Sequence, residues 1–598
     1  MKKIVYLLLI ILVFTSCSDD FLNKKPLDKL SESAVFESAD LMDQYVVALY
    51  QVIPQPYTEG SLAACTDEAY FRFGGTSTRY IANGNMTADM IIYIKDGGQA
   101  HNTRLTLLSL WPRVFSYIRD MNIFLSRVDD AQVPEEVKDR LKGEVLFLRA
   151  WTYSNMLARY GGIPIIKEIY QLQEDYDIVR DKYDDCVDFI IKDLDEASSL
   201  LPDKPIVKGR IGADLCKALK ARTYLYAASP LFNDPAEPNP SEQNLIFKGK
   251  YDRNKWKLAK DAAYEVIQRA NAGAYSLANY DDYWKNVQCP EVIWAKYYDA
   301  TTNYGGDYGY SAQLYYAPAE LGGWHSILPV ENIVCDYEMA ATGKKPFEAA
   351  SGYNPADPWG GRDPRFYKTI LSPESVYMDD TIRICKPAAG NKVITKNDQW
   401  YSYTTGTNGT GFWLSKWVIE EAEISEKINT TLMYPWFRLA EIYLIYAEAS
   451  LEYNDDVATC AEYLNKVRDR ADVKMPHIQA SLSVDQMRKK VVQERRIELA
   501  FENFRYFDLR RWKIAMDYEN RPVYRISGER RDDNTIIWHI AKPKAIPDGE
   551  PDYSNSQDLY GSAFPGATKR MLNEHHLVPI PRNEWEKSKG KIVQNPGY

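Results

Sequence analysis

The stretch ERRIELAFENFRYFDLRRW, residues 494–512, carries the pattern that decides the fold. Its apolar side chains Ile497, Phe501 and Phe504 fall at positions i, i+4 and i+7, which form one stripe along a helix. Because helical faces usually carry pairs of opposite charges, we expect the charged residues here to be structural, with ligand binding as the less favoured alternative. The charged residues are Arg495, Arg496, Arg510 and Arg511, with Glu494, Glu498, Glu502 and Asp508 as partners.

Similar helical periodicity extends through much of the chain on both sides of this stretch. Residues 134–160 begin with Pro134-Glu135-Glu136, a favourable first turn, and end at Gly161-Gly162, a helix terminator. Further helices are predicted over residues 183–201, 211–229, 253–271, 436–453, 456–471 and 483–511.

Three of the predicted helices share a phrase in which a small residue precedes a tyrosine by one turn. The phrases are Ala150-Trp-Thr-Tyr153, Ala221-Arg-Thr-Tyr224 and Ala440-Glu-Ile-Tyr443. Small residues let neighbouring helices approach closely, and the first two phrases lie about two tetratricopeptide periods apart. The pattern predicts helix-pair repeats that stack into a superhelix from residues 134–271 and 434–512; chance similarity of amphipathic helices is the alternative.

Two irregular stretches interrupt the helices and are the places where we expect function. Residues 51–105 are rich in Gly, Thr and aromatic residues, and residues 272–430 contain turn signals throughout. Long irregular segments in a compact protein usually carry function. The expected organisation is a signal peptide (1–16), a tether (17–30), a helical region (31–271) with the insertion 51–105, a ligand-binding or capping region (272–430) and a C-terminal region (431–598).

The first residues, MKKIVYLLLIILVFTSC, have the layout of an export signal. Lys2 and Lys3 precede an apolar run from Ile4 to Phe14, which is too short to span a bilayer as a helix. Thr15 and Ser16 then lead into Cys17, and this order resembles a bacterial lipoprotein signal, in which the cysteine is lipidated. An ordinary secretory signal with an incidental cysteine is the alternative.

The composition excludes several function classes. A net charge of −10 makes the chain a poor candidate for binding nucleic acid or anionic lipid. The eight cysteines include no CxxC pair, so neither a disulfide scaffold nor a zinc site is expected. The 44 tyrosines and 14 tryptophans suit surfaces that touch hydroxyl-rich or peptide ligands, although many can also pack between helices.

The chain contains no motif of an active site. GxSxG, HExxH and GxxxxGK[ST] are all absent from the sequence. A pair of glycosidase carboxylates is defined by separation in space, so counting acidic residues leaves that alternative open. We therefore predict no catalytic residue, no cofactor and no metal.

The best candidate for a binding site is the loop 303–325, where aromatic residues alternate with glycine. Aromatic rings give apolar platforms for the C–H faces of sugar rings, and nearby polar side chains can bond hydroxyl groups. Trp324, beside Gly322-Gly323, is the favoured platform; each tyrosine is about equally expected to pack the loop onto the helices. Trp359 is a weaker candidate. The candidates in the loop are Asn303, Tyr304, Asp307, Tyr308, Tyr310 and Trp324.

Several phrases together resemble the SusD/RagB family of surface nutrient-binding lipoproteins. They occur in a consistent order from Cys17 to the C-terminus, and the stretch 494–512 is the most specific of them. The other phrases are ARYGGIPI (158–165), GRDPRFYKTIL (361–371), FRLAEIYLIYAEA (437–449), VRDRA (467–471), IPRNE (580–584) and the terminal NPGY.

The resemblance implies a mainly α-helical fold with four tetratricopeptide-like units and an irregular capping region. It implies a lipid-anchored protein on the outer membrane that captures oligosaccharide, or peptide in some members, and delivers it to a SusC-type TonB-dependent barrel. It also implies ligand contacts from an early loop, here 67–85. The residues of that loop that we select are Phe71, Phe73, Arg79, Tyr80 and Asn83.

Three functions therefore compete at this point. The first is a glycan-binding lipoprotein docked on a transporter, the second is a lipid-anchored glycoside hydrolase, and the third is a helical-repeat scaffold that binds only protein. Bound but uncleaved oligosaccharide would separate the first from the second. Binding that survives substitution of the aromatic loop would favour the third.

Overall fold

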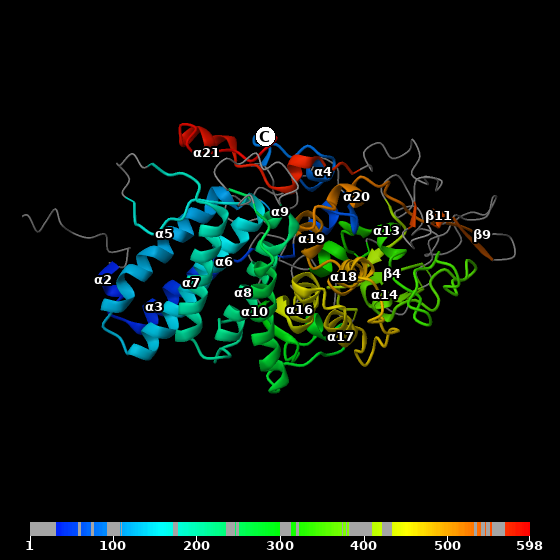
Figure 1. Ribbon diagram of the computed structural model, residues 1–598, viewed down its shortest axis with the longest axis horizontal. Helices are drawn as coiled ribbons and strands as arrows, with labels where there is room; N and C mark the ends of the chain where they lie inside the picture. Colours follow the sequence, from blue (N-terminus) through cyan, green and yellow to red (C-terminus); the bar gives the residue numbers. More distant parts are fainter. Residues whose placement is uncertain are drawn as a thin grey trace, which may run out of the picture.

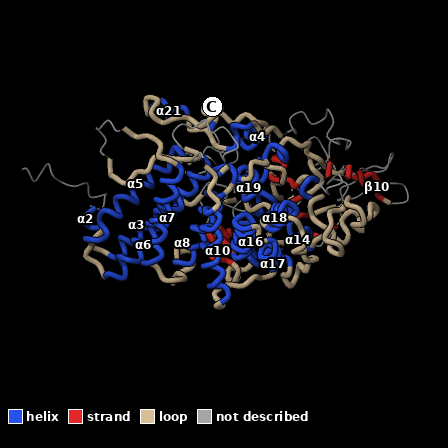
Figure 2. The backbone as a smooth tube through the Cα atoms, in the orientation of Figure 1, coloured by secondary structure: helices blue, strands red, loops and turns tan. Residues whose placement is uncertain are grey.

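The computed structural model is dominated by helices (Figure 2). It describes residues 32–54, 56–57, 61–72, 77–91, 108, 110–170, 177–234, 245–246, 250–298, 312–318, 322–373, 375–377, 380–381, 409–420, 433–530, 535–539, 544–545, 551–552 and 569–598. The predicted signal peptide and Cys17 lie outside these residues.

The long helices pack side by side in an elongated array (Figure 1). Helix α6 packs against α5 and α7, α8 against α7 and α10, and α16 against α10, α17 and α18. The prediction of a mainly α-helical fold is therefore confirmed. The long helices are α3 (Ala39–Leu49), α5 (Trp111–Arg127), α6 (Glu135–Tyr160), α7 (Tyr183–Leu200), α8 (Ala213–Ala228), α10 (Asn254–Asn271), α16 (Leu439–Asn454), α17 (Val457–Arg468) and α18 (Val484–Glu498).

Local sequence signals set the ends of these helices. Helix α6 begins after Pro134 with two acidic residues in its first turn, and it ends at Gly161, whose φ of 77° favours glycine. Helix α18 begins with a capping box in which Ser483 and Gln486 bond each other's backbone.

The repeated small residues lie where the helices meet. Ala150, Ala221 and Ala440 are each 0% exposed. Their tyrosine partners differ, because Tyr153 is buried against Phe189 at a ring distance of 4.9 Å, whereas Tyr224 and Tyr443 are half-buried. The alanine of each phrase thus permits close helix packing, while only the first tyrosine is a core residue.

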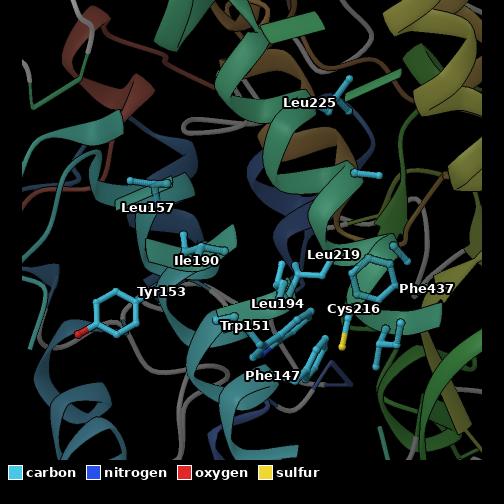
Figure 3. Packing of buried hydrophobic residues seen from close by; sticks show 14 of the residues in the cluster. Phe147, Trp151, Tyr153, Leu157, Ile190, Leu194, Cys216, Leu219, Leu225 and Phe437 are labelled. Atoms are coloured by element: carbon cyan, nitrogen blue, oxygen red, sulfur yellow. The ribbon is translucent and has the colours of Figure 1, made fainter. Parts of the chain in front are cut away.

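One continuous apolar core runs along the helical array. Figure 3 shows Phe147 and Trp151 of α6 near Cys216 and Leu219 of α8. Phe437, which precedes α16, approaches Trp151 with ring centroids 6.0 Å apart. This core joins the two halves of the helical array that are separated in sequence by the irregular region.

The prediction of one helix over residues 483–511 is wrong. Helix α18 ends at Glu498, and α19 (Phe504–Arg511) begins only after a sharp turn. Phe501 and Asn503 have φ values of 59° and 66°, which no continuous α-helix contains. The turn is fixed from outside, since the side chain of Asn503 accepts hydrogen bonds from Ser61 Oγ at 3.0 Å and Leu62 N at 3.2 Å.

The charged residues of 494–512 are buried and structural, but their partners are mostly distant. Glu498 accepts hydrogen bonds from Arg365, Arg438 and Arg470 at 2.6–3.0 Å. Arg495 pairs with Asp508 at 2.9 Å across the turn. The expectation of pairs along one helical face holds for Asp508 and Arg511 of α19, which lie 2.8 Å apart. It is wrong for most of the other charged residues, because the helix ends at Glu498 and their partners come from distant segments.

This network attaches the irregular region to the helices. Arg365, from the RDPR turn, bonds Asp363, Glu494 and Glu498. Lys416 bonds Glu502 at 2.8 Å and lies about 5 Å from the ring centroids of Tyr280, Tyr283 and Trp417. Burial lowers the pKa of Lys416 to about 8, although Glu502 opposes the shift.

Outside the helical array, the described residues form short helices, two-stranded sheets and a second apolar core, which includes Tyr283, Trp413 and Phe501. The antiparallel pairs are β1 (Ala69–Phe71) with β3 (Ile327–Pro329), β2 (Val292–Tyr297) with β8 (Met433–Arg438), β4 (Ile370–Leu371) with β7 (Trp413–Leu414), β5 (Val376–Tyr377) with β6 (Asp380–Thr381), β9 (Ser527–Arg530) with β10 (Ile536–His539), and β11 (Lys544–Ala545) with β12 (Pro551–Asp552).

Short helices complete the described part of the chain. They are α2 (Glu32–Val35), α4 (Ser77–Ala82), α9 (Pro230–Asn233), α11 (Asp282–Lys285), α12 (Ala312–Tyr316), α13 (Glu331–Val334), α14 (Pro364–Thr369), α20 (Ala515–Glu519) and α21 (Arg582–Lys587). In the described ranges, no helix has the length and apolar character that crossing a bilayer requires.

Candidate functional site

A short antiparallel sheet joins the two loops that the sequence selects. Strand β1 belongs to the early loop and strand β3 follows directly after the aromatic loop, and Tyr70 pairs with Leu328. The pairing continues for one more hydrogen bond, from Arg72 N to Ser326 O at 3.1 Å. Two segments more than 250 residues apart in the sequence thus lie side by side where β1 ends and β3 begins. We call this place, around Arg72 and Ser326, the β1–β3 edge.

Trp324 lies at this edge and is half-buried. Its backbone N–H donates to Leu314 O at 2.7 Å. Its ring meets the half-buried Tyr315 of α12 edge to face, with centroids 5.6 Å apart and planes at 66°. The main chain at Trp324 is therefore fixed and its ring packs on Tyr315, while part of the indole surface stays accessible, as a binding platform requires.

The early loop contributes an arginine, a tyrosine and an asparagine from α4 and the turn after it. The Arg79 guanidinium donates to Tyr70 Oη and lies over the Tyr70 ring, 5.1 Å from its centroid. Tyr80 is 42% exposed and Asn83 is half-buried. These side chains present one charged, one aromatic and one amide group at the surface.

A buried histidine connects the two loops beside Trp324. His325 Nδ1 lies 3.2 Å from the Arg72 guanidinium, and the histidine backbone has a φ of 36°. Burial, with the nearby charge of Arg72, lowers the pKa of His325 to about 3. The imidazole is neutral at physiological pH, so its Nδ1 accepts the hydrogen bond from Arg72.

Buried charged groups anchor the start of the early loop, at residues 67–69. Asp67 bonds Arg496 and Arg505 at 2.6–3.0 Å, and these guanidinium groups overcome burial to keep the pKa of Asp67 well below its usual range. Burial raises the pKa of neighbouring Glu68 to about 7. The Lys569 ammonium donates to the carbonyls of Ala64, Thr66 and Ala69. The base of the site is thus rigid.

Two residues proposed from the sequence are core residues. Phe71 lies within β1 and is 2% exposed. Trp359 is 8% exposed, and its ring packs on Phe366, Phe412 and Trp538. Neither side chain is available to a ligand, because both are buried in the second core.

Several other candidates lie outside the described residues. Of the loop 303–325, only Trp324 among the proposed ligand residues is described. Asn303, Tyr304, Asp307, Tyr308, Tyr310 and Phe73 remain sequence-based expectations. Tyr70, Arg72 and His325 were not predicted from the sequence, and Tyr315 was expected only as one tyrosine of the aromatic loop. The proximity of Tyr70, Arg72 and His325 depends on the β1–β3 pairing, which local patterns do not specify.

Two protein-family models match this chain. The model described as "SusD family" matches residues 290–598, which is more than half of the chain. The model described as "Starch-binding associating with outer membrane" matches residues 20–225. The second match contains the early loop, and the first contains Trp324.

Individual proteins are similar over nearly the whole length. A SusD-like protein of Bacteroides ovatus is 22% identical to this chain in an alignment 620 positions long. The alignment covers 98% of this chain and 95% of that protein. A solved SusD-like protein from Bacteroides fragilis has a TM-score of 0.69 at 22% identity, covering 96% of this chain and all of that chain.

A second solved structure from Bacteroides fragilis, described as a SusD-like carbohydrate binding protein, has a TM-score of 0.68 at 21% identity. The similarity covers 92% of this chain and 99% of that chain. At these identities the solved structures support the fold, including the mainly helical architecture described above.

Proposed function

The chain belongs to the SusD family, and we propose that it captures an oligosaccharide at the outer membrane and delivers it to a SusC-like TonB-dependent barrel. The observation that carries this proposal is the meeting of the two loops at the β1–β3 edge, where Trp324 is accessible. The description of one matching family as starch-binding and outer-membrane-associated supports the ligand class and the location.

The side chains of the two loops suit a sugar ligand. Trp324 offers an apolar face for the C–H groups of a sugar ring, and Arg79 and Asn83 offer donors and an acceptor for hydroxyl groups. The buried contacts of Asp67 and Lys569 fix the early loop before the ligand arrives, which limits the entropy lost on binding. A glycan array probed with the full chain tests the ligand class; binding of peptides alone would contradict it.

We expect Cys17 to be the membrane anchor. Replacing Cys17 with alanine removes the thiol that accepts the acyl chains, so the variant should stay unacylated. Metabolic labelling with radioactive palmitate, followed by gel fluorography, measures this. Label that still enters the Cys17→Ala protein would show that the anchor is not Cys17; the Cys65→Ala variant, which changes a buried cysteine, is the matched control.

We expect no hydrolysis of the bound glycan. The proposed task is capture, and the transport energy comes from the barrel, so no bond in the ligand has to break. The purified protein incubated with its glycan should release no reducing ends above a protein-free control. Release that disappears when one carboxylate is substituted would establish a hydrolase instead.

A further inference from the structure

A second surface feature lies where α18 meets residues 336–348 of the irregular region. It is a groove of about 1260 Å³ along α18, bordered by the C-terminal part of α16, the start of α10 and the chain around α20. The groove shares one residue with the candidate site, Arg496, which also bonds Asp67 at 2.6 Å. Trp324, Arg79, Tyr80 and Asn83 are not part of its described lining. The groove exceeds the usual 300–1,000 Å³ of a small-molecule pocket, so it has room for a chain of several units.

An aromatic platform in this groove is held rigidly. Trp512 lines the groove and is half-buried, and its Nε1 donates to Glu448 Oε1 at 2.7 Å. The Arg511 guanidinium lies 4.3 Å from the indole centroid. Arg511 also bonds both oxygens of Glu448, at 2.5 and 2.7 Å. The orientation of the indole is therefore set before any ligand binds.

The charges of the groove are balanced and largely tied to one another. Its described lining holds seven carboxylates and six cationic side chains. Arg488 bonds both oxygens of Glu452 at 2.5 and 3.0 Å, and it also bonds Asp485 at 2.6 Å. On the other side, Lys490 bonds Glu338 at 3.1 Å. The lining gives no net attraction for a phosphate, a nucleic acid or an acidic polymer.

We infer that this groove is a second binding site for a neutral oligosaccharide. A rigid indole supplies the apolar platform, and fixed ion pairs supply donors and acceptors that hydroxyl groups can share without carrying charge. The inference rests on the proposed function, because the ligand is of the same class. A second site would let the protein hold a long chain while one end occupies the β1–β3 edge.

The number of ligands bound per chain tests the inference. Maltohexaose, laminarihexaose, mannohexaose and xylohexaose are titrated into the full-length protein by isothermal calorimetry. We expect a bound probe to occupy two sites in the wild type. Trp512→Ala should weaken the groove site by on the order of tenfold, as expected for loss of one aromatic contact, and should leave the other site unchanged.

A variant that avoids the Trp512 network keeps the test independent of folding. Lys489 is exposed and lines the groove. Lys489→Trp fills the groove and should abolish one of the two sites, while Lys489→Ala should keep both. Trp324→Ala should weaken only the other site, by about tenfold to a hundredfold.

The outcomes separate the two proposals. If the wild type binds at one site, and this site is lost in Trp324→Ala and unaffected by Lys489→Trp, the inferred groove site is wrong and the proposed function stands. If the wild type binds at one site, and this site is lost in Lys489→Trp and kept in Trp324→Ala, the groove is the binding site and the proposed site at the β1–β3 edge is wrong. A wild type that binds none of the four probes overturns both.

Discussion

Replacing Glu498 with glutamine is expected to destabilise the protein by about 3–5 kcal/mol, the usual cost of removing one partner from a buried ion-pair network. Glu498 is 0% exposed and accepts hydrogen bonds from Arg365, Arg438 and Arg470. Glutamine keeps the shape but removes the charge, so three buried guanidinium groups lose a shared anion. Urea unfolding followed by circular dichroism measures the effect.

An exposed pair provides the matched control. Glu462 contacts Lys466 at 3.2 Å on the surface of α17, and its side chain is 59% exposed. Glu462→Gln should change stability by less than about 0.5 kcal/mol. A Glu498→Gln protein as stable as the control would show that the network does not hold the irregular region to the helices.

The same substitution should alter the response to acid. Burial disfavours the charge on Glu498, but Arg470, Arg438 and Arg365 outweigh it and keep its pKa well below its usual range. A carboxylate with a lowered pKa stabilises the fold above its unfolded pKa, about 4.3, and the contribution fades as the pH falls through the folded value. The stability gap between wild type and Glu498→Gln should therefore narrow below about pH 4.

Replacing Trp324 with alanine is expected to weaken glycan binding by about tenfold to a hundredfold. Loss of one large apolar platform costs about 1–3 kcal/mol, and each 1.4 kcal/mol is a factor of ten. The melting temperature should stay nearly unchanged, because Trp324 is half-buried and lies in the irregular segment before β3 rather than in a helix. Calorimetric titration with a glycan identified on the array, together with a thermal melt, gives both quantities.

Trp585, which is 40% exposed on α21, is the control for loss of an accessible indole. Trp585→Ala should bind glycan like the wild type. A Trp324→Ala protein that melts at a much lower temperature would identify Trp324 as a core residue. A variant that is stable and binds fully would move the site elsewhere, and the loop 67–85 would become the leading candidate.

Helices were predictable where their signals are local. The start of α6 after Pro134 and its end at Gly161 follow from residues within one turn of each boundary. The buried alanines at 150, 221 and 440 also follow from a short repeated phrase. These features need only the 3.6-residue period and the conformational preferences of proline and glycine.

The turn between α18 and α19 was not predictable, because it depends on contacts from far along the chain. Phe501 N donates to Glu68 Oε1 at 3.2 Å, and its carbonyl accepts from Trp417 Nε1 at 3.1 Å. Asn503 Nδ2 donates to Tyr434 Oη at 3.2 Å. The apolar stripe of Ile497, Phe501 and Phe504 suggests one helix, whereas these tertiary bonds stabilise a left-handed turn within it.

The candidate site shows the same division. The sequence by itself determined a mainly helical array and the residue types in two irregular loops, since periodicity and composition are local properties. Tertiary structure alone decided that Trp324 is accessible while Phe71 and Trp359 are core residues. It also decided that the two loops meet, because the pairing of Tyr70 with Leu328 spans most of the N-terminal half of the chain and is selected by packing rather than by neighbouring residues.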